Sequence, residues 1–340
     1  MRGTFFALLF FGVWWLSGCE NNSMGYAQLD LQAETVTLSD NGKVLIAGDS
    51  EMLTIVDLSD PSQMVMKGGI SPTFDRVSTI KISPDAQKVY AGYGHDGVFE
   101  IDISDKDLPK TNRILFGEKH ENGRKESISL NGANDIAFSK DRTKLYVVNW
   151  GEGFVVYDIS DLDHVHKISS LALDDKVVST RRVILSQDET KVYIAAGMAG
   201  MIVIDVSKPV HPKVISQYKT ISFLHDIAIS EDERTAYLGC NEKGIYVLDI
   251  GDIHSPKVLG TYKADFAYKL KLLDRSRRLY VADGVSGIRI FDTKDRTKLI
   301  PQKSFELQEG IVYDLAIGKD GKYLYAALGN TLKLYEIPGS

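Results

Sequence analysis

Residues 53–60 read LTIVDLSD, and this short apolar run with its acidic ending decides the fold. The pattern recurs as VFEIDISD (98–105), FVVYDISD (154–161), MIVIDVSK (201–208), IYVLDIGD (245–252), IRIFDTKD (288–295) and, in degenerate form, LKLYEIPG (332–339). The acidic anchor residues are Asp57, Asp102, Asp158, Asp205, Asp249, Asp292 and Glu336, which lie 45, 56, 47, 44, 43 and 44 residues apart. Seven copies at about 45 residues match the period of β-propeller blades.

Each copy predicts four short strands. Residues 226–262, for example, read as DIAIS, a polar turn, AYLG, a glycine-containing turn, GIYVLDI and, after a proline, KVLGTY. These runs are rich in β-branched and aromatic residues, and no long segment has the helical period. A small sheet that is apolar on both faces must bury them against neighbouring sheets. We therefore predict an all-β, seven-bladed propeller of four-stranded antiparallel blades.

Two further recurring positions support this alignment. A glycine stands five residues before the anchor in five copies, at Gly97, Gly153, Gly200, Gly244 and Gly287. We expect a hairpin there with a positive φ, which is costly for residues with a Cβ. The anchor aspartates precede a turn, where we expect them to accept backbone N–H bonds as Asx-turns do.

The last copy ends at Glu336 and supplies only three strands. Residues 26–32 precede the first strand of copy one and resemble the fourth strand of the other copies. We predict that they pair with residues 331–337 and close the ring, which removes a free sheet edge.

The copies resemble the LVIVD-repeat family of extracytoplasmic propellers, whose repeat runs roughly L-x-V-x-D-I-S-D-P-x-x-P. Residues 53–61 carry this pattern best, and residues 204–209 followed by Pro212 are also similar to it. The resemblance covers about residues 31–337. It departs at Glu336, which replaces the aspartate, and at Met52 and Thr331, which replace the turn glycine. The resemblance implies the fold and adds little about chemistry.

The first residues read as an export signal. Arg2 precedes an apolar run over residues 4–15, which is too short to span a bilayer and suits a signal peptide. Residues 16–19, LSGC, resemble the lipobox of bacterial lipoproteins. We expect a lipoprotein signal peptide over 1–18, lipidation at Cys19, a tether over 19–25 and the propeller over 26–340; the alternative is an ordinary signal peptide with a chance cysteine. By resemblance to Gram-negative sorting rules, Glu20 favours anchoring in the outer membrane, on its periplasmic side or at the cell surface.

Composition excludes several classes of function. The net charge of -6 becomes -7 when residues 1–18 and their single charge, on Arg2, are removed, and this mixed acidic surface predicts no nucleic-acid partner. With Cys19 acylated, Cys240 is the only remaining thiol, so no intramolecular disulfide can form. No Cys/His cluster has zinc or haem spacing. We expect no metal and no cofactor.

The inner strands of a propeller begin at one end of the central channel, which we call the channel mouth. Alignment of the copies places at these starts Thr35, Thr79, Asp135, Arg182, Asp226, Lys269 and Asp314. The last five alternate in charge from acid to base. Alternating charges on adjacent blades can pair and hold the ring in register, or they can converge on a polar or anionic ligand.

Three other features fall at the same end of the channel. Trp150, the only tryptophan after residue 18, lies on a predicted hairpin, where it can serve as an interface anchor or cover its own blade. His225 with Asp226 is the best acid/base candidate. A polar insertion at residues 117–126 lengthens the spacing between Asp102 and Asp158; it is either a surface excursion, or a partner-docking loop or lid.

These observations favour a binding scaffold over an enzyme. The sequence lacks G-x-S-x-G, H-E-x-x-H and a phosphate-binding glycine loop. We therefore predict a membrane-anchored scaffold of the bacterial cell envelope that binds an envelope protein or a small polar ligand at the channel mouth, through Asp135, Trp150, Arg182, His225, Asp226, Lys269 and Asp314. The alternative is a hydrolase or lyase with its site at the mouth, since propeller enzymes assemble such sites from scattered residues.

Overall fold

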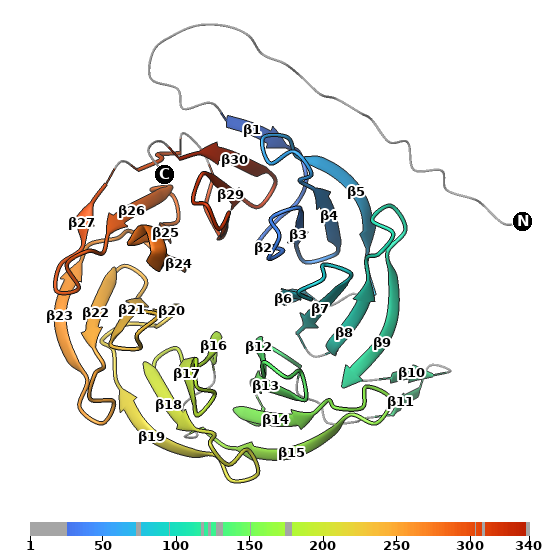
Figure 1. Cartoon of the computed structure of the whole chain (residues 1–340), viewed down its shortest axis with the longest axis horizontal. Helices are drawn as coiled ribbons and strands as arrows, with labels where there is room; N and C mark the ends of the chain where they lie inside the picture. The colour runs from blue at the N-terminus through green and yellow to red at the C-terminus, as the bar shows by residue number, and fades with distance from the viewer. Residues whose placement is uncertain are drawn as a thin grey trace, which may run out of the picture.

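A computed structural model describes residues 26–72, 76–94, 96–116, 119–121, 124–126, 132–149, 151–173, 179–302, 304–307 and 310–337. Within these ranges, seven four-stranded antiparallel sheets stand around a central axis like blades (Figure 1). The chain follows the ring blade by blade, and each blade runs from an inner strand outward. The predicted all-β, seven-bladed fold is confirmed.

The strands of the first four blades have the following bounds. Blade one contains β2 (Thr35–Leu38), β3 (Val44–Gly48), β4 (Leu53–Asp57) and β5 (Val65–Ile70); blade two contains β6 (Val77–Ile82), β7 (Lys88–Tyr93), β8 (Gly97–Asp102) and β9 (Lys110–Phe116). Blade three contains β12 (Asp135–Phe138), β13 (Lys144–Val148), β14 (Phe154–Asp158) and β15 (His166–Leu171); blade four contains β16 (Arg182–Leu185), β17 (Lys191–Ala195), β18 (Met201–Asp205) and β19 (Lys213–Tyr218).

The remaining blades follow the same plan. Blade five contains β20 (Asp226–Ile229), β21 (Thr235–Gly239), β22 (Ile245–Asp249) and β23 (Lys257–Tyr262); blade six contains β24 (Lys269–Leu273), β25 (Arg278–Ala282), β26 (Ile288–Asp292) and β27 (Ile300–Pro301), with a short 3-10 turn at Asp274–Ser276 between its first two strands. Blade seven contains β28 (Asp314–Ile317), β29 (Tyr323–Ala327), β30 (Leu332–Glu336) and β1 (Tyr26–Leu29).

The ring closes through the N-terminal strand, in agreement with the prediction. β1 pairs antiparallel with β30, with Ala27 opposite Leu334 and Leu29 opposite Leu332. Figure 1 shows β1 as the outermost strand beside β30, so the last blade combines the two ends of the described chain. A bridge between Ala33 and Gly329 extends the closure toward the first residues of blade one.

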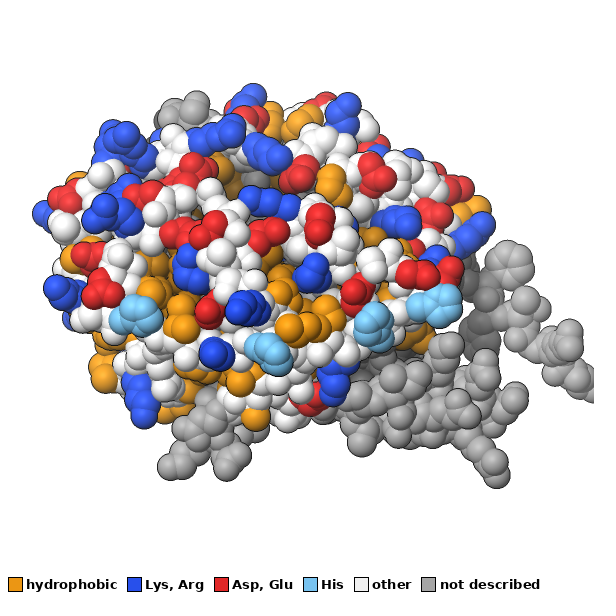
Figure 2. Space-filling model, turned by 60° about the horizontal axis from the view of Figure 1, so that its bottom comes forward, with side chains coloured by type: hydrophobic (Ala, Val, Ile, Leu, Met, Phe, Trp, Pro, Cys, Tyr) orange, Lys and Arg blue, Asp and Glu red, His pale blue; other side chains and the backbone are white. Residues whose placement is uncertain are grey.

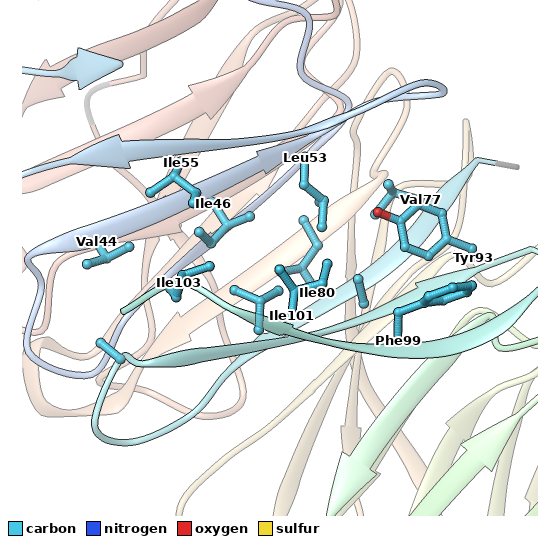
Figure 3. Packing of buried hydrophobic residues seen from close by; sticks show 13 residues of the cluster. Val44, Ile46, Leu53, Ile55, Val77, Ile80, Tyr93, Phe99, Ile101 and Ile103 are labelled. Carbon is cyan, nitrogen blue, oxygen red and sulfur yellow. The ribbon is translucent and has the colours of Figure 1, made fainter. Parts of the chain in front are cut away.

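Apolar side chains fill the spaces between blades. In the described residues these side chains form seven buried clusters, each shared by two adjacent blades. Figure 3 shows the cluster between blades one and two, where Ile46 and Ile55 face Ile80 and Ile101. Full burial of one such side chain contributes about 1.5–3 kcal/mol, so the packing of adjacent blades against each other stabilises the ring.

The recurring turn residues behave as the sequence predicts. Gly153 and Gly200 have φ values of +84° and +79°. The anchor Asp158 accepts the backbone N–H of Ser160 at 2.9 Å, and Asp205 accepts that of Ser207 at 2.9 Å. Each turn therefore uses a short-range hydrogen bond to direct the chain from the third strand of its blade to the outer strand.

The insertion between β9 and β12 differs from the loop that we expected. Its described residues form two short antiparallel strands, β10 (Lys119–Glu121) and β11 (Arg124–Glu126), which Figure 1 places at the outer side of the ring. The predicted signal peptide over 1–18, Cys19 and the tether over 19–25 lie outside the described residues. No helix in the described ranges has the length and apolar character needed to cross a membrane.

Candidate functional site

The predicted mouth residues do gather at one end of the channel. Asp135, Arg182, Asp226, Lys269 and Asp314 are each the first residue of an inner strand, as is Thr35. Thr79 differs slightly, because β6 begins at Val77 and an irregularity in its pairing falls between these two residues. We call this end the mouth face; it comprises the starts of the inner strands, the segments that lead into them and the hairpins between the second and third strands.

Three buried aspartates of this ring bind the next blade. Asp135, Asp226 and Asp314 are at most 3% exposed. Each accepts the backbone N–H of the second residue of the following inner strand: Val183 at 3.0 Å, Leu270 at 2.9 Å and Val36 at 3.2 Å, respectively. The carboxylates on blades three, five and seven therefore tie blades four, six and one to them.

Cations complete these contacts. Arg182 lies between two aspartates, with Nη1 3.7 Å from Asp135 and Nε 3.4 Å from Asp226. Lys81 Nζ is 3.2 Å from Asp135, and Lys271 Nζ is 3.7 Å from Asp314. Of the charges predicted to alternate, all but Lys269 thus pair across blade boundaries, and the partners include two lysines that the alignment of strand starts did not identify.

Burial and pairing shift the pKa values in this network. Burial alone would raise the pKa of Asp135, but Lys81 and Arg182 hold it well below its usual value. Burial lowers the pKa of Lys81 to about 8, although Asp135 opposes this change. Burial opposes the charge of Arg182 as well, but Asp226 and Asp135 raise its pKa. Near neutral pH Asp135 is therefore ionised and paired with Lys81 and Arg182.

The channel contains a cavity of about 400 Å³. Its cationic lining consists of Lys81, Arg142, Arg181, Arg182, Lys269 and Lys271, and its anionic lining consists of Asp40, Asp135 and Asp314. Hydroxyl groups of Thr35, Ser78 and Thr79 also face it. This size lies within the range of small-molecule sites, and the lining is mainly polar and basic. By contrast, acidic and basic side chains are interspersed over the outer surface seen in Figure 2.

His225 lies in a cluster of partly buried rings on the mouth face. Its ring centroid is 4.8 Å from that of Phe223, 5.6 Å from Phe266 and 5.4 Å from Tyr268. Tyr313 extends the series, 6.0 Å from Tyr268. We call these five side chains the aromatic cluster; the segments before and at the starts of the inner strands of blades five, six and seven supply them.

Hairpins of neighbouring blades pack against this cluster. Gly197 has a φ of +54°, and a Cβ there would lie 2.9 Å from the ring of Phe223, so a glycine lets the ring approach the backbone. Gly284 similarly lies under Phe266. Backbone bridges also join Gly197 to Leu224, beside Phe223 and His225, and Gly284 to Val312, beside Tyr313. The aromatic cluster is therefore continuous with the hairpin tips.

The candidate acid/base residues occupy different environments. The Asp226 carboxylate accepts the backbone N–H groups of Ile227 and Leu270, both at 2.9 Å, and lies beside Arg182. Burial, reinforced by Arg181 and Lys269, lowers the pKa of His225 to about 4. A histidine with this pKa is neutral at pH 7 and lacks the second ring proton that an imidazolium would donate as an acid.

Several predicted features cannot be placed. Trp150 and Cys19 lie outside the described residues, so the expected interface anchor and the lipidation site remain predictions. On the hairpin between β25 and β26, Asp283 is fully buried, pairs with Arg289 and accepts the N–H of Phe266 at 2.7 Å. Among the residues described, no group of three or more His, Cys, Asp or Glu is arranged to hold a metal ion.

The structure also adds residues that the strand-start alignment missed. Lys81 and Lys271 lie two positions after Thr79 and Lys269, and Phe223 and Phe266 lie two positions before His225 and Tyr268. Alternate residues of a strand share a face. These four residues could therefore have been located from the sequence by taking the residues two positions before or after each aligned position.

Comparison with known families agrees with this architecture. The model of the LVIVD repeat matches residues 35–71, 133–171 and 189–220. These ranges fall on blade one, blade three and the last three strands of blade four. A comparison with curated proteins found no match. The chain is thus a seven-bladed β-propeller that carries LVIVD repeats.

Proposed function

We propose that this propeller is a protein-binding scaffold of the bacterial cell envelope and that a partner protein docks on its mouth face. The observation that carries the proposal is a set of exposed apolar side chains around the aromatic cluster. Met198, Ile221 and Val285 are 63%, 72% and 64% exposed. Met198 and Val285 each follow a hairpin glycine that packs on the cluster, and Ile221 precedes Phe223 by two residues.

This arrangement has the composition of a protein interface. Interfaces are enriched in aromatic residues and methionine, and a few such side chains near the centre supply most of the binding energy. The closed ring presents these groups on a rigid support, so little ordering is needed when a partner binds. In this proposal Arg182 and the buried aspartates maintain the shape of the face, while the aromatic cluster and the exposed apolar residues contact the partner.

The proposed cellular location depends on the N-terminal segment of the chain. We propose that residues 1–18 are removed, that Cys19 is lipidated and that the mature chain is held at the outer membrane. Six residues between Cys19 and β1 reach roughly 20 Å when extended, which would keep the propeller close to the membrane. Fractionation of cells that express the native chain or Cys19→Ala tests this step: the native chain should sediment with membranes and the variant should not. Equal distribution of both chains would contradict the anchor.

The docking surface is tested by cross-linking in native membranes followed by affinity purification. We expect the double variant Ile221→Asp, Val285→Asp to lose a partner that the native chain retains. Val214→Asp is the matched control, because Val214 is 48% exposed but lies on the outer strand β19. If the control loses the partner as completely as the double variant, or if neither loses it, the mouth face is not the docking surface.

A further inference from the structure

The central channel contains more positive charge than its own carboxylates neutralise. Asp135 is paired with Lys81, Asp226 with Arg182, and Asp314 with Lys271. Asp40, the remaining carboxylate of the cavity lining, lies 3.4 Å from Lys319. Each carboxylate that lines the cavity therefore has a cationic partner, and so does Asp226, which contacts the cavity residue Arg182.

Three further cations line the same cavity: Arg142, Arg181 and Lys269. Among the described residues, no carboxylate lies within ion-pair distance of any of them. Two contact rings instead, since the Arg142 guanidinium lies 4.4 Å from the centroid of Phe138 and that of Arg181 lies 5.4 Å from the centroid of Phe223. Stacking on a ring orients a guanidinium and leaves its N–H groups available for an anion.

Arg181 and Lys269 approach the mouth from the two sides of blade five. Arg181 directly precedes the inner strand of blade four, and Lys269 begins that of blade six. His225 directly precedes the inner strand of blade five, which lies between them. The positive charges of Arg181 and Lys269 both oppose protonation of His225, so their electrostatic fields overlap at this residue. A polar cavity enclosed by protein walls focuses such a field and attracts counter-ions.

We propose that the channel binds a small multivalent oxyanion, carrying phosphate or carboxylate groups, with Arg181 and Lys269 as its principal ligands at the mouth. Lys81, Arg182 and Lys271 line the cavity farther along the inner strands and add to its positive potential. The cavity of about 400 Å³ accommodates a ligand of metabolite size and is too small for a folded partner. This site adjoins the aromatic cluster, because Arg181 stacks on Phe223, but its residues line the channel cavity, whereas the exposed docking residues Met198, Ile221 and Val285 do not.

The site is tested by isothermal titration calorimetry of the full-length chain with pyrophosphate and with citrate, at an ionic strength of about 20 mM where screening is weak. We expect at least one of these anions to bind with one-to-one stoichiometry, and added salt to weaken the binding. Loss of one charged hydrogen-bonding group should lower the affinity about tenfold or more, so Arg181→Gln and Lys269→Gln should each have this effect. Preference for pyrophosphate or for citrate distinguishes phosphate from carboxylate recognition.

Two controls keep the result specific. Lys219→Gln removes the same charge from an exposed lysine in the segment that connects β19 to blade five. Lys219 does not line the cavity, so this change should leave the affinity for the anion unchanged. Lys269→Arg should retain binding, which separates loss of charge from damage to the fold. The proposal is overturned if neither anion binds the native chain, or if Lys219→Gln weakens binding as much as Lys269→Gln does. Loss of the docking partner with retained anion binding would affect only the proposed scaffold function.

Discussion

The Arg182 guanidinium on blade four lies 3.4 Å from the Asp226 carboxylate on blade five, and its other side faces Asp135 on blade three. One side chain thus joins three consecutive blades across the channel. Both aspartates also bind backbone N–H groups of the next blade. The charge alternation visible in the sequence therefore has a structural role here, and within this group only Lys269 is left without a carboxylate partner among the described residues.

Arg182→Met should destabilise the ring. Removal of one member of a buried charged network leaves the other charge without compensation and lowers the free energy of unfolding by about 3–5 kcal/mol. Urea unfolding followed by far-UV circular dichroism measures the change. Lys269→Met is the control and should cost less than about 1 kcal/mol, because no ion pair is lost. Similar losses for both variants would show that Arg182 contributes no more to stability than its neighbour does.

His225 should titrate far below the usual range. Burial, with Arg181 and Lys269, lowers its pKa to about 4, so its ring resonances should show a midpoint near that value in an NMR titration. The unfolded chain protonates this residue near pH 6.5, whereas the folded chain remains neutral down to about pH 4. Stability from His225 is therefore fully present above about pH 6.5 and is lost as the pH falls toward about 4.

The same effect should appear in unfolding experiments. Between about pH 4.5 and 7, the native chain should lose on the order of 2 kcal/mol more than His225→Phe does, since phenylalanine preserves the ring contacts but cannot bind a proton. A titration midpoint near 6.5, or identical pH profiles for the two chains, would show that the ring is not held in its neutral form by burial.

Alanine substitutions at two glycines should distinguish the cost of a positive φ from the cost of a steric clash. Gly42 and Gly200 both have positive φ, +71° and +79°, but a Cβ at Gly42 meets no atom within 4 Å, whereas one at Gly200 would lie 2.0 Å from the carbonyl oxygen of Tyr218. Gly42→Ala should therefore cost only about 1 kcal/mol from the unfavourable φ. Gly200→Ala should cost at least about 3 kcal/mol, because the outer strand must move. Thermal and urea unfolding provide the comparison, and equal costs would refute this difference.

The closing strand should be necessary for a monomeric propeller. A chain that starts at residue 34 loses β1 and the buried side chains of Leu31 and Ala33. We expect its free energy of unfolding to fall by at least about 3 kcal/mol, and the exposed edge of β30 to cause self-association. Light scattering detects the latter. A chain that starts at residue 26 should behave as a stable monomer, and equal behaviour of the two truncated chains would contradict this role of β1.

The sequence predicts most of the fold because each repeat is defined by interactions between residues that are close in the chain. Asp158 with its turn and Gly200 with its positive φ are determined by residues close in the chain, so the alignment places strand ends and hairpins correctly. The start of every inner strand except β6, which begins two residues before Thr79, follows from the same alignment. The closing strand was also predictable, because copy seven lacks a fourth strand and residues 26–32 supply its pattern.

The contacts between blades could not be predicted in the same way. Whether Asp226 pairs with Arg182, and whether its carboxylate also reaches the N–H of Leu270, depends on the spacing between separately folded sheets. Likewise, Phe223 is close to His225 in the chain, but only the assembled ring brings Phe266 and Tyr268 of the next blade beside it. Insertion length was visible, but its hairpin form was not, because residues 117–126 lack a strong strand signal.

The seam between β1 and β30 has a consequence for biogenesis. The first strand of the propeller to leave the ribosome must wait, unpaired, until the last strand, β30, has been made. Contacts between such distant segments are slow to form, and incomplete chains expose adhesive surfaces in the meantime. Nascent chains of this protein therefore have a long vulnerable period, and a chaperone that shelters residues 26–32 would shorten it most.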